Sequence, residues 1–457
     1  MATKIVLNTQ QESAIADMLK FLKSDEADMF TLKGFAGTGK TTTIQFLLDR
    51  MTENGLTERF VFTAPTHKAV KVLRRMAERA GIEVAFSTIH SLLGLKIKLV
   101  GDKQLLEPQK RRNKDPMNSV DIIVVDECSM IGSELFKHIQ DSLKKYDVKY
   151  IFMGDPAQLP PVGEKESQTF EATPCRASLT QVMRQRGENP VLGVCTDIRE
   201  AFLRGDMRLP KITPGMADDG SIGVSVMVGD LFSEWMPIAF SHEKFNDNPD
   251  RFRVVAWRND TVNRINAMIH DWRYPECATW LATGEPITFV KPMMNMSLLN
   301  QRSDVPGDEI LVQTDFEAEI IDCQPTVRKE FPDVPCWLVT VAVETGERLT
   351  FYALDNDGIV TRNAVMQLIA AENKRVIKAG DKKADWWPYY QLQQSFAEIR
   401  PAYCMTAHKS QGSTFENVFV DVMDIWANPN KHEAMQCLYV ACSRASHHLI
   451  VNATGAQ

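Results

Sequence analysis

The chain has 457 residues, 44% of them apolar and 24% charged, which is the composition of a folded globular protein with about two to four domains. With 52 basic and 59 acidic residues its net charge is −7, so any polyanion must be bound by local clusters of charge and not by the molecule as a whole. No stretch is apolar for long enough to span a membrane, and the nine cysteines lack the close pairs of a zinc site. We therefore expect a cytoplasmic protein with free thiols and no membrane association.

The first chemical motif follows a short apolar strand predicted at residues 29–32. It has the spacing Gly34-x-x-x-x-Gly39-Lys40-Thr41, and an amphipathic helix is predicted from Thr42 onward. Glycines at this spacing let consecutive backbone N–H groups point at phosphate oxygens, the lysine offers a charge to the β and γ phosphates, and the threonine hydroxyl can ligate Mg²⁺. The predicted nucleotide-binding residues of this loop are Gly37, Thr38, Gly39, Lys40, Thr41 and Thr42.

Two later strands end in polar residues that suit the same chemistry. Residues 122–125 read as a fully buried strand, and Asp126 and Glu127 follow it directly. Asp126 is placed to hold Mg²⁺ through water, and Glu127 to take a proton from the attacking water. A third strand, within residues 148–154, precedes Gln158. Because strand ends of a parallel sheet meet at the ligand crevice, we expect Gln158 to orient that water or to sense the γ phosphate.

A basic hairpin lies between the phosphate loop and the strand that precedes Asp126 and Glu127. Residues 95–100 and 104–106 read as two short strands joined at Gly101-Asp102. A cluster of positive charge follows at Lys110, Arg111, Arg112 and Lys114. Taken alone, this pattern fits a solvated basic loop as well as a contact to nucleic acid.

After about residue 250 the chain begins a second α/β pattern without a second phosphate loop. A strand is followed by a helix from Thr261, and two more buried strands are predicted at residues 418–422 and 449–451. One nucleotide bound between two similar domains explains this asymmetry. Alternating strands interrupt the second domain; they begin with DEILVQ, include a hairpin turn at Thr345-Gly346, and predict a small antiparallel barrel.

Two further segments of the second half have less specific patterns. Residues 208–220 are rich in glycine, proline and aspartate and predict a loop. Four aromatic residues suit either packing between domains or stacking on bases; they are Trp386, Trp387, Tyr389 and Tyr390.

Taken together, the motifs resemble those of the superfamily 1B helicases, the Dda/RecD-like group. The resemblance covers nearly the whole chain and rests on LNTQQESA, the phosphate loop, APTHKAV, STIHSLLG, LTQVMRQ, YCMTAHKSQGSTFENVFVD and LYVACSRASHHLIV. It implies an α/β fold of two RecA-like parallel-sheet motor domains, with a small hairpin insertion in the first and an SH3-like β-barrel insertion in the second. The expected boundaries are 1–86 and 119–177 for motor domain 1A, 87–118 for the hairpin insertion 1B, 178–285 and 400–457 for motor domain 2A, and 286–399 for the barrel insertion 2B.

The resemblance also implies roles for individual residues. Gln11 is expected to read the adenine of ATP, Arg184 to contact a phosphate, and Gly412 to belong to the nucleotide site. Arg444 is expected to reach the γ phosphate from the facing domain, a contact worth roughly 10³ to 10⁵ in rate. The expected contacts to the DNA backbone are Pro65, Thr66, His67, Thr88, His90, Thr406, His408 and Lys409, although each such cluster alone also suits a helix cap.

These residues predict an enzyme, an ATP- and Mg²⁺-dependent DNA helicase that moves along single-stranded DNA and opens the duplex. The direction expected is 5′ to 3′, because HKSQGST at residues 408–414 resembles the members that move that way. In this family a pin emerges where the basic hairpin lies; here its tip has no aromatic residue, so Leu99 and Val100 would act as a blunt wedge.

The expected partners are single-stranded and forked DNA, together with replication or recombination proteins, and the protein is expected to act as a monomer. Three alternatives stay open at this stage. They are a phosphate-loop ATPase that remodels protein partners, a nucleotide-gated scaffold without catalysis, and a helicase that tracks on RNA.

Overall fold

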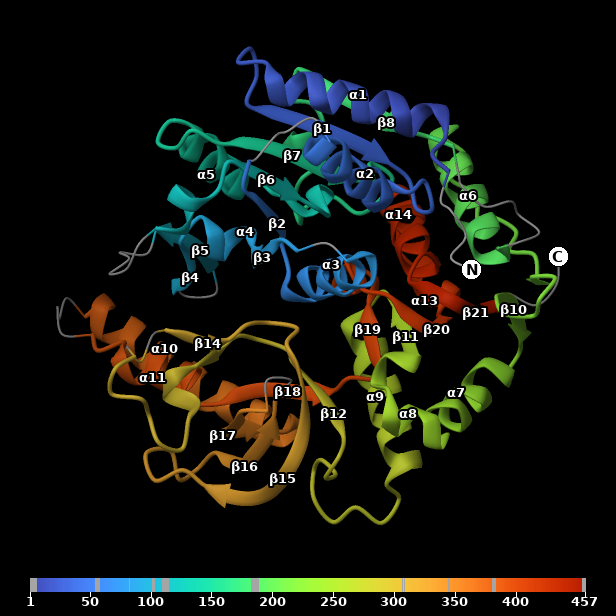
Figure 1. Ribbon diagram of the computed structural model, residues 1–457. Coiled ribbons are helices and arrows are strands. Elements are labelled where there is room, and N and C mark those ends of the chain that lie inside the picture. The colour runs from blue at the N-terminus through green and yellow to red at the C-terminus, as the bar shows by residue number, and fades with distance from the viewer. Residues whose placement is uncertain are drawn as a thin grey trace.

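The computed structural model describes residues 6–53, 58–81, 83–100, 103–108, 115–181, 189–305, 307, 309–343, 346–379 and 384–453. Within these ranges the strands form two six-stranded sheets, one closed barrel and two small two-stranded sheets (Figure 1). No helix in the same ranges is long and apolar enough to cross a membrane. All of the cysteines are free thiols, and most are buried.

The first sheet has the strand order β3-β2-β6-β7-β1-β8, and every neighbouring pair is parallel. Its strands are β1 (Met29–Gly34), β2 (Phe60–Ala64), β3 (Ala85–Thr88), β6 (Ile122–Val125), β7 (Lys149–Gly154) and β8 (Cys175–Leu179). The helices of this part are α1 (Thr9–Lys23), α2 (Lys40–Glu53), α3 (His67–Ala80), α4 (Ile89–Leu92) and α5 (Ser133–Leu143).

The central strand β6 is buried on both faces, as its apolar sequence predicts. Ile122 and Val124 pack in one core cluster with residues of α1 and α2. Ile123 and Val125 pack in another with residues of α4 and α5. Because side chains alternate along a strand, helices on the two sides of the sheet bury both sets, and the end of β6 is held at a defined place.

The second sheet has the order β19-β11-β20-β21-β10-β9 and is parallel except for the edge strand β9. Its strands are β9 (Gly215–Met216), β10 (Gly223–Val228), β11 (Phe252–Ala256), β19 (Cys404–Thr406), β20 (Phe415–Val420) and β21 (Ala445–Ala453). The predicted loop at 208–220 contains only the short β9. The helices are α6 (Pro190–Leu203), α7 (Leu231–Ser241), α8 (Glu243–Asp247), α9 (Asn259–Arg273), α12 (Ala407–Ser410), α13 (Val422–Trp426) and α14 (Lys431–Cys442).

The predicted barrel is present, with the closed order β12-β15-β16-β17-β18. These strands are β12 (Pro286–Phe289), β15 (Glu317–Val327), β16 (Pro335–Ala342), β17 (Arg348–Leu354) and β18 (Ala397–Pro401). The expectation that DEILVQ adds a barrel strand is wrong. Its strand β14 (Ile310–Val312) pairs with β13 (Met293–Met294), because Asp315, with φ of 64°, turns the chain before β15 begins.

Two helices between β17 and β18, which the sequence patterns did not predict, are α10 (Asn356–Lys378) and α11 (Trp387–Gln394). The four aromatic residues lie at the start of α11. Trp386 and Tyr389 meet edge to face with ring centroids 5.7 Å apart, whereas Trp387 is 64% exposed. Part of the cluster is therefore packed and part is open. Short 3₁₀ helices occupy Pro116–Ser119, Cys128–Met130, Gln168–Phe170, Pro249–Arg251 and Asn295–Ser297.

The basic hairpin consists of β4 (Leu95–Val100) and β5 (Lys103–Pro108), paired antiparallel from Leu95 opposite Pro108 to Val100 opposite Lys103. Leu95 and Leu106 pack against a core cluster of the first domain. The Leu106 amide also donates to Glu134 Oε1 of α5 at 3.1 Å. The hairpin base is thus anchored, while its tip at Gly101-Asp102 and the basic cluster at Lys110, Arg111, Arg112 and Lys114 lie outside the described residues.

Three of the predicted domain boundaries fall inside strands and need correction. The boundary at 86/87 cuts β3, which pairs with β2 as far as Thr88. The boundary at 177/178 cuts β8, which pairs with β1 as far as Leu179. The boundary at 399/400 cuts β18, which pairs with β12 as far as Pro401. The predicted limits followed motif edges, whereas the ladders of hydrogen bonds run a few residues further.

Candidate nucleotide site and nucleic-acid interface

The phosphate loop connects β1 to α2. Gly37 and Gly39 have φ of 76° and 79°, the left-handed region in which glycine carries no steric penalty. The Lys40 ammonium donates to the carbonyl oxygens of Gly34 at 2.6 Å and Phe35 at 3.2 Å. The lysine therefore lies folded over its own loop, where a bound phosphate would meet its charge. Helix α2 begins at Lys40, two residues before the predicted start.

The acidic pair follows β6, beside this lysine. The Asp126 carboxylate accepts a hydrogen bond from the Glu127 amide at 2.8 Å. Glu127 itself has φ of 52°, which is rare for a residue with a side chain. Desolvation and the neighbouring Asp126 raise the pKa of Glu127 to about 7, while Arg444 and Lys40 lower it. Desolvation likewise raises the pKa of Asp126 against the opposing effect of Lys40.

A hydrogen-bond relay joins the phosphate loop to the second domain, and sequence reasoning missed it. The buried Asp155, just after β7, accepts from the hydroxyl of Tyr439 in α14 at 2.5 Å. The same hydroxyl accepts from the Ala36 amide of the loop at 3.0 Å. Figure 1 shows α14 meeting the first domain beside α2. The strand-end position of Asp155 could have pointed to this residue; nothing local singled out Tyr439.

The predicted Gln158 lies in the same region. Its backbone carbonyl accepts from Gln436 of α14 at 3.0 Å. The side-chain Oε1 is buried and has no hydrogen-bond partner among the described residues. Because a buried acceptor without a partner is costly, this oxygen fits a role in which a water or ligand completes its bonding.

Gln11 is brought to the loop by α1. It is buried, closes a capping box with Asn8, and donates from Nε2 to the Thr38 carbonyl at 3.3 Å. Its amide is therefore fixed at the phosphate loop by two structural contacts. The nucleotide contact expected of Gln11 stays a prediction.

The residues expected from the second domain differ in their placement. Arg444 is buried, donates to the carbonyls of Val440 at 3.0 Å and Ser413 at 3.1 Å, and acts electrostatically on Glu127. Arg184 lies outside the described residues. Gly412 lies against Ala69 of α3, where an added Cβ would be 2.9 Å from the alanine Cβ. That position is at the start of α3, and the three atoms nearest to such a Cβ all belong to Ala69 and to Thr66, the cap of α3.

These residues fit Mg²⁺·ATP on four grounds. The loop glycines have the required backbone conformation, the lysine donates to loop carbonyls, an acidic pair follows β6 of the same sheet, and the buried Gln158 Oε1 has no hydrogen-bond partner among the described residues. Lys40 would hold the β and γ phosphates. Thr41 and Asp126 would hold the metal ion, directly and through water.

The three threonines predicted to contact DNA all cap helices. Thr66 accepts from the Ala69 amide at 3.2 Å at the start of α3. Thr88 and Thr406 do the same for α4 and α12, at 3.1 and 3.3 Å. The cap interpretation is therefore correct for the three threonine side chains.

A histidine accompanies each cap, and burial disfavours its charged form. Desolvation lowers the pKa values of His67, His90 and His408. His408 Nε2 lies 3.6 Å from a Glu433 carboxylate oxygen, which partly counteracts the effect of burial. Neutral imidazoles can donate one hydrogen bond to a phosphate without adding charge. Pro65 lies immediately before this group, between β2 and the Thr66 cap.

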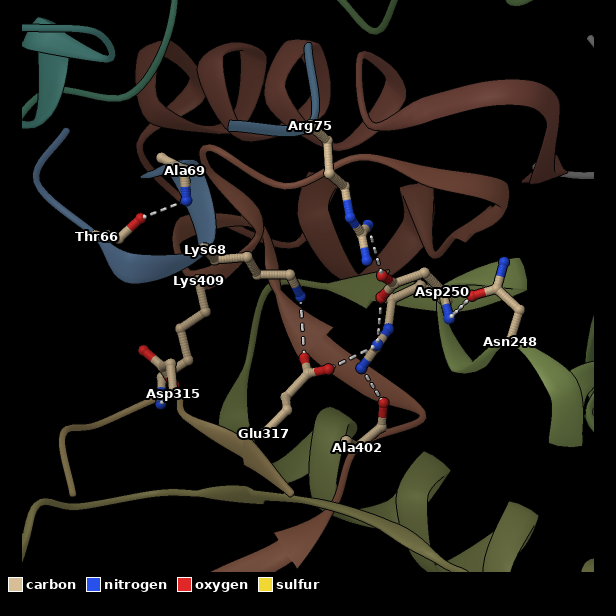
Figure 2. A network of polar contacts seen from close by, with 11 residues as sticks. Thr66, Lys68, Ala69, Arg75, Asn248, Asp250, Asp315, Glu317, Ala402 and Lys409 are labelled. Carbon is tan, nitrogen blue, oxygen red and sulfur yellow. Dashed lines mark hydrogen bonds and ion pairs between the residues drawn. The ribbon is translucent and has the colours of Figure 1, made fainter. Parts of the chain in front are cut away.

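Two lysines beside these caps are paired with carboxylates from the barrel insertion. Lys409, a predicted DNA contact, lies 2.6 Å from Asp315. Lys68 of α3 lies 2.9 Å from Glu317, which also accepts from Arg253 at 3.1 Å (Figure 2). The start of α3, the start of α12 and the first barrel residues of β15 thus meet in one polar network.

Comparisons with known proteins agree with this architecture. A family profile described as an AAA domain matches residues 6–201, and one described as a UvrD-like helicase C-terminal domain matches residues 401–452. The chain is 28% identical to an uncharacterised protein of Acanthamoeba polyphaga mimivirus, over 97% of this chain and 99% of that one. It is 24% identical to the ATP-dependent DNA helicase dda of Enterobacteria phage T4, over 96% of this chain and 98% of that one.

Among solved structures, a Pif1 helicase studied for DNA unwinding at forked duplexes shares the fold. It aligns with a TM-score of 0.50 and 17% identity, over 99% of this chain and 93% of that chain. Two parallel-sheet domains with a barrel in the second are thus confirmed as the RecA-like architecture predicted from the motifs.

The family profiles and the relatives support a superfamily 1B helicase, an enzyme of the ATP-dependent DNA helicase class. Within that class its relatives are of the Dda, RecD and Pif1 type. The resemblance inferred from the motifs is therefore confirmed.

Proposed function

We propose that this helicase hydrolyses Mg²⁺·ATP between its two motor domains and uses the change in domain contact to step 5′ to 3′ along single-stranded DNA, parting the duplex ahead. The observation that carries the proposal is the relay from Ala36 through Tyr439 to Asp155. It joins the phosphate loop of one domain to a helix of the other. Occupation or loss of a phosphate at the loop therefore acts directly on the contact between the domains.

Each residue of the site has a role in this proposal. When bound, ATP supplies the phosphoryl group, and Mg²⁺ supplies positive charge that offsets the negative charge of the phosphates. Lys40 exchanges its bonds to loop carbonyls for bonds to phosphate oxygens. Glu127, with a pKa of about 7, is poised to accept a proton from water. Arg444 approaches from the second domain, so turnover depends on how closely the domains meet.

The nucleic-acid track in this proposal crosses both domains. Gly412, which follows the end of α12, packs on Ala69 near the start of α3, so the segment after α12 lies close to the start of α3. Hydrogen-bond donors at helix starts suit a nucleic-acid strand that is held by its phosphate backbone, with few contacts that depend on base sequence. DNA as the track is supported by the relatives, and the 5′ to 3′ direction by the resemblance at residues 408–414.

The test is unwinding of 5′-tailed, 3′-tailed and forked duplexes with ATP, with Lys40→Ala as the inactive control. We expect the 5′-tailed and forked substrates to open and the 3′-tailed substrate to stay closed. Opening of the 3′-tailed substrate alone would reverse the proposed direction. ATPase activity that single-stranded DNA does not stimulate would favour remodelling of a protein, and stimulation by RNA alone would favour an RNA track.

A further inference from the structure

One face of helix α6 covers the phosphate loop from the second domain. A Cβ added to Gly37 would lie 3.0 Å from the methyl carbons of Leu192. Seven residues further along, the Arg199 guanidinium lies over the Phe35 ring, 4.3 Å from its centroid. Because residues seven apart share a helix face, Leu192 and Arg199 contact the loop side by side.

Arg199 is a buried cation with no anionic partner among the described residues. Its side chain is 7% exposed, and its buried Nε has no hydrogen-bond partner among the described residues. No ion pair within the described ranges includes it, so the Phe35 ring is its one recorded polar or aromatic contact. Every other buried arginine of these ranges donates at least one hydrogen bond: Arg253, Arg328, Arg362, Arg400 and Arg444.

The position of Arg199 indicates the kind of anion that it would meet. The Phe35 residue beneath it also offers its carbonyl to Lys40, the lysine expected to hold the β and γ phosphates. The buried Cys195 thiol, one turn earlier on α6, experiences the charges of Arg199, Arg444 and Asp155 together. Arg199 therefore stands with Arg444 on the second-domain side of the nucleotide site.

We propose that Arg199 binds the γ phosphate of the nucleotide, as a further arginine of the facing domain in addition to the expected Arg184 and Arg444. The inference rests on the proposed ATP-driven function. Without nucleotide the guanidinium rests on the Phe35 ring, and with a nucleoside triphosphate it turns from the ring to the phosphate oxygens. A guanidinium suits this exchange because it stacks on aromatic rings and also forms paired, charge-assisted bonds to phosphate.

The experiment compares Arg199→Gln and Arg199→Lys with the wild-type protein. Arg204→Gln is the matched control, because Arg204 is an exposed residue that directly follows the same helix and pairs only with Glu200 at 3.6 Å in the described structure. Dissociation constants are measured by calorimetry for Mg²⁺·ATPγS and for Mg²⁺·ADP, and the melting temperature is measured without nucleotide.

We expect Arg199→Gln to bind the triphosphate analogue about tenfold more weakly, the loss of one charge-assisted hydrogen bond. Its affinity for ADP should change less than about twofold, and Arg199→Lys should recover part of the loss. The melting temperature should stay the same or rise, because an unpaired buried charge has been removed.

Two results would overturn the proposal. One is an equal loss of affinity for ATPγS and for ADP together with a lower melting temperature, which would indicate a purely structural role. The other is unchanged affinity for the triphosphate analogue. Failure of the proposed function itself is distinguishable, since the wild-type protein would then show no ATPase activity stimulated by single-stranded DNA.

Discussion

Replacing Glu317 by glutamine tests the polar network that joins the barrel to both motor domains (Figure 2). Glu317 accepts from Lys68 and from Arg253, whose side chain is only 1% exposed. Arg253 also donates to the Ala402 carbonyl, so it keeps one partner when the carboxylate is removed. The variant therefore removes one charge from a three-domain contact without emptying the site.

The size of the effect follows from the pKa values. Desolvation alone would raise the pKa of Glu317, but Arg253 and Lys68 prevail and lower it from 4.5 to about 2. That shift corresponds to about 3 kcal/mol of stability near neutral pH. Desolvation also lowers the pKa of Lys68 despite its partner, which offsets part of the gain, so we expect Glu317→Gln to cost about 2 kcal/mol at pH 7.

The lowered pKa of Glu317 also determines how its contribution to stability changes with pH. Because the folded-state pKa of Glu317 is below the unfolded value of 4.5, its contribution is present above pH 4.5 and is lost as the pH falls toward 2. The cost of Glu317→Gln should therefore fall by about half between pH 7 and pH 3. Urea unfolding, followed by intrinsic fluorescence, measures the free energy of unfolding of the variant and of the wild-type protein at each pH.

Glu330→Gln is the control for this experiment. Glu330 also pairs with a buried arginine, Arg328, at 3.3 Å, but its side chain is 54% exposed, so its replacement should cost less than about 0.5 kcal/mol. A Glu317→Gln cost no larger than the control, or one that does not change with pH, would refute the reasoning.

Three further outcomes are expected. Arg444→Ala should bind ATP normally but lose roughly 10³-fold or more of its DNA-stimulated turnover; steady-state ATPase assays check this, and normal turnover would remove Arg444 from the mechanism. Deletion of residues 98–104 should abolish unwinding and spare DNA-stimulated ATPase, whereas loss of both would make the hairpin structural. Tyr439→Phe should cost about 1–3 kcal/mol of stability, because the buried Asp155 loses its donor, and a thermal melt indistinguishable from wild type would contradict the relay.

Much of the nucleotide site was readable from local sequence. The phosphate loop and the strand before Asp126 and Glu127 were placed within a residue or two, whereas the threonine caps of α3, α4 and α12 belong to clusters that the order of the motifs had assigned to DNA contacts. Each depends on backbone geometry set by neighbours a few positions away: glycines in left-handed conformations, a hydroxyl accepting from an amide three residues on, and a run of four apolar residues.

The errors have a common physical origin. DEILVQ alternates like a barrel strand, yet the turn at Asp315 sends it to a different partner, β13. The boundaries at 86/87, 177/178 and 399/400 followed motif edges and so cut strands whose pairing continues. Strand partners are chosen by the packing of the whole domain, which a local pattern does not contain.

The sequence alone therefore determined the chemistry of this protein: a phosphate loop, its acidic partners, and a family resemblance carried by ordered motifs. Only the tertiary structure decided how the two halves act on each other. The Tyr439 relay to Ala36 and the approach of Arg199 to Phe35 each join residues more than 160 positions apart. Such contacts depend on how complete domains pack together, because a side chain meets a distant partner only where the folded surfaces are complementary.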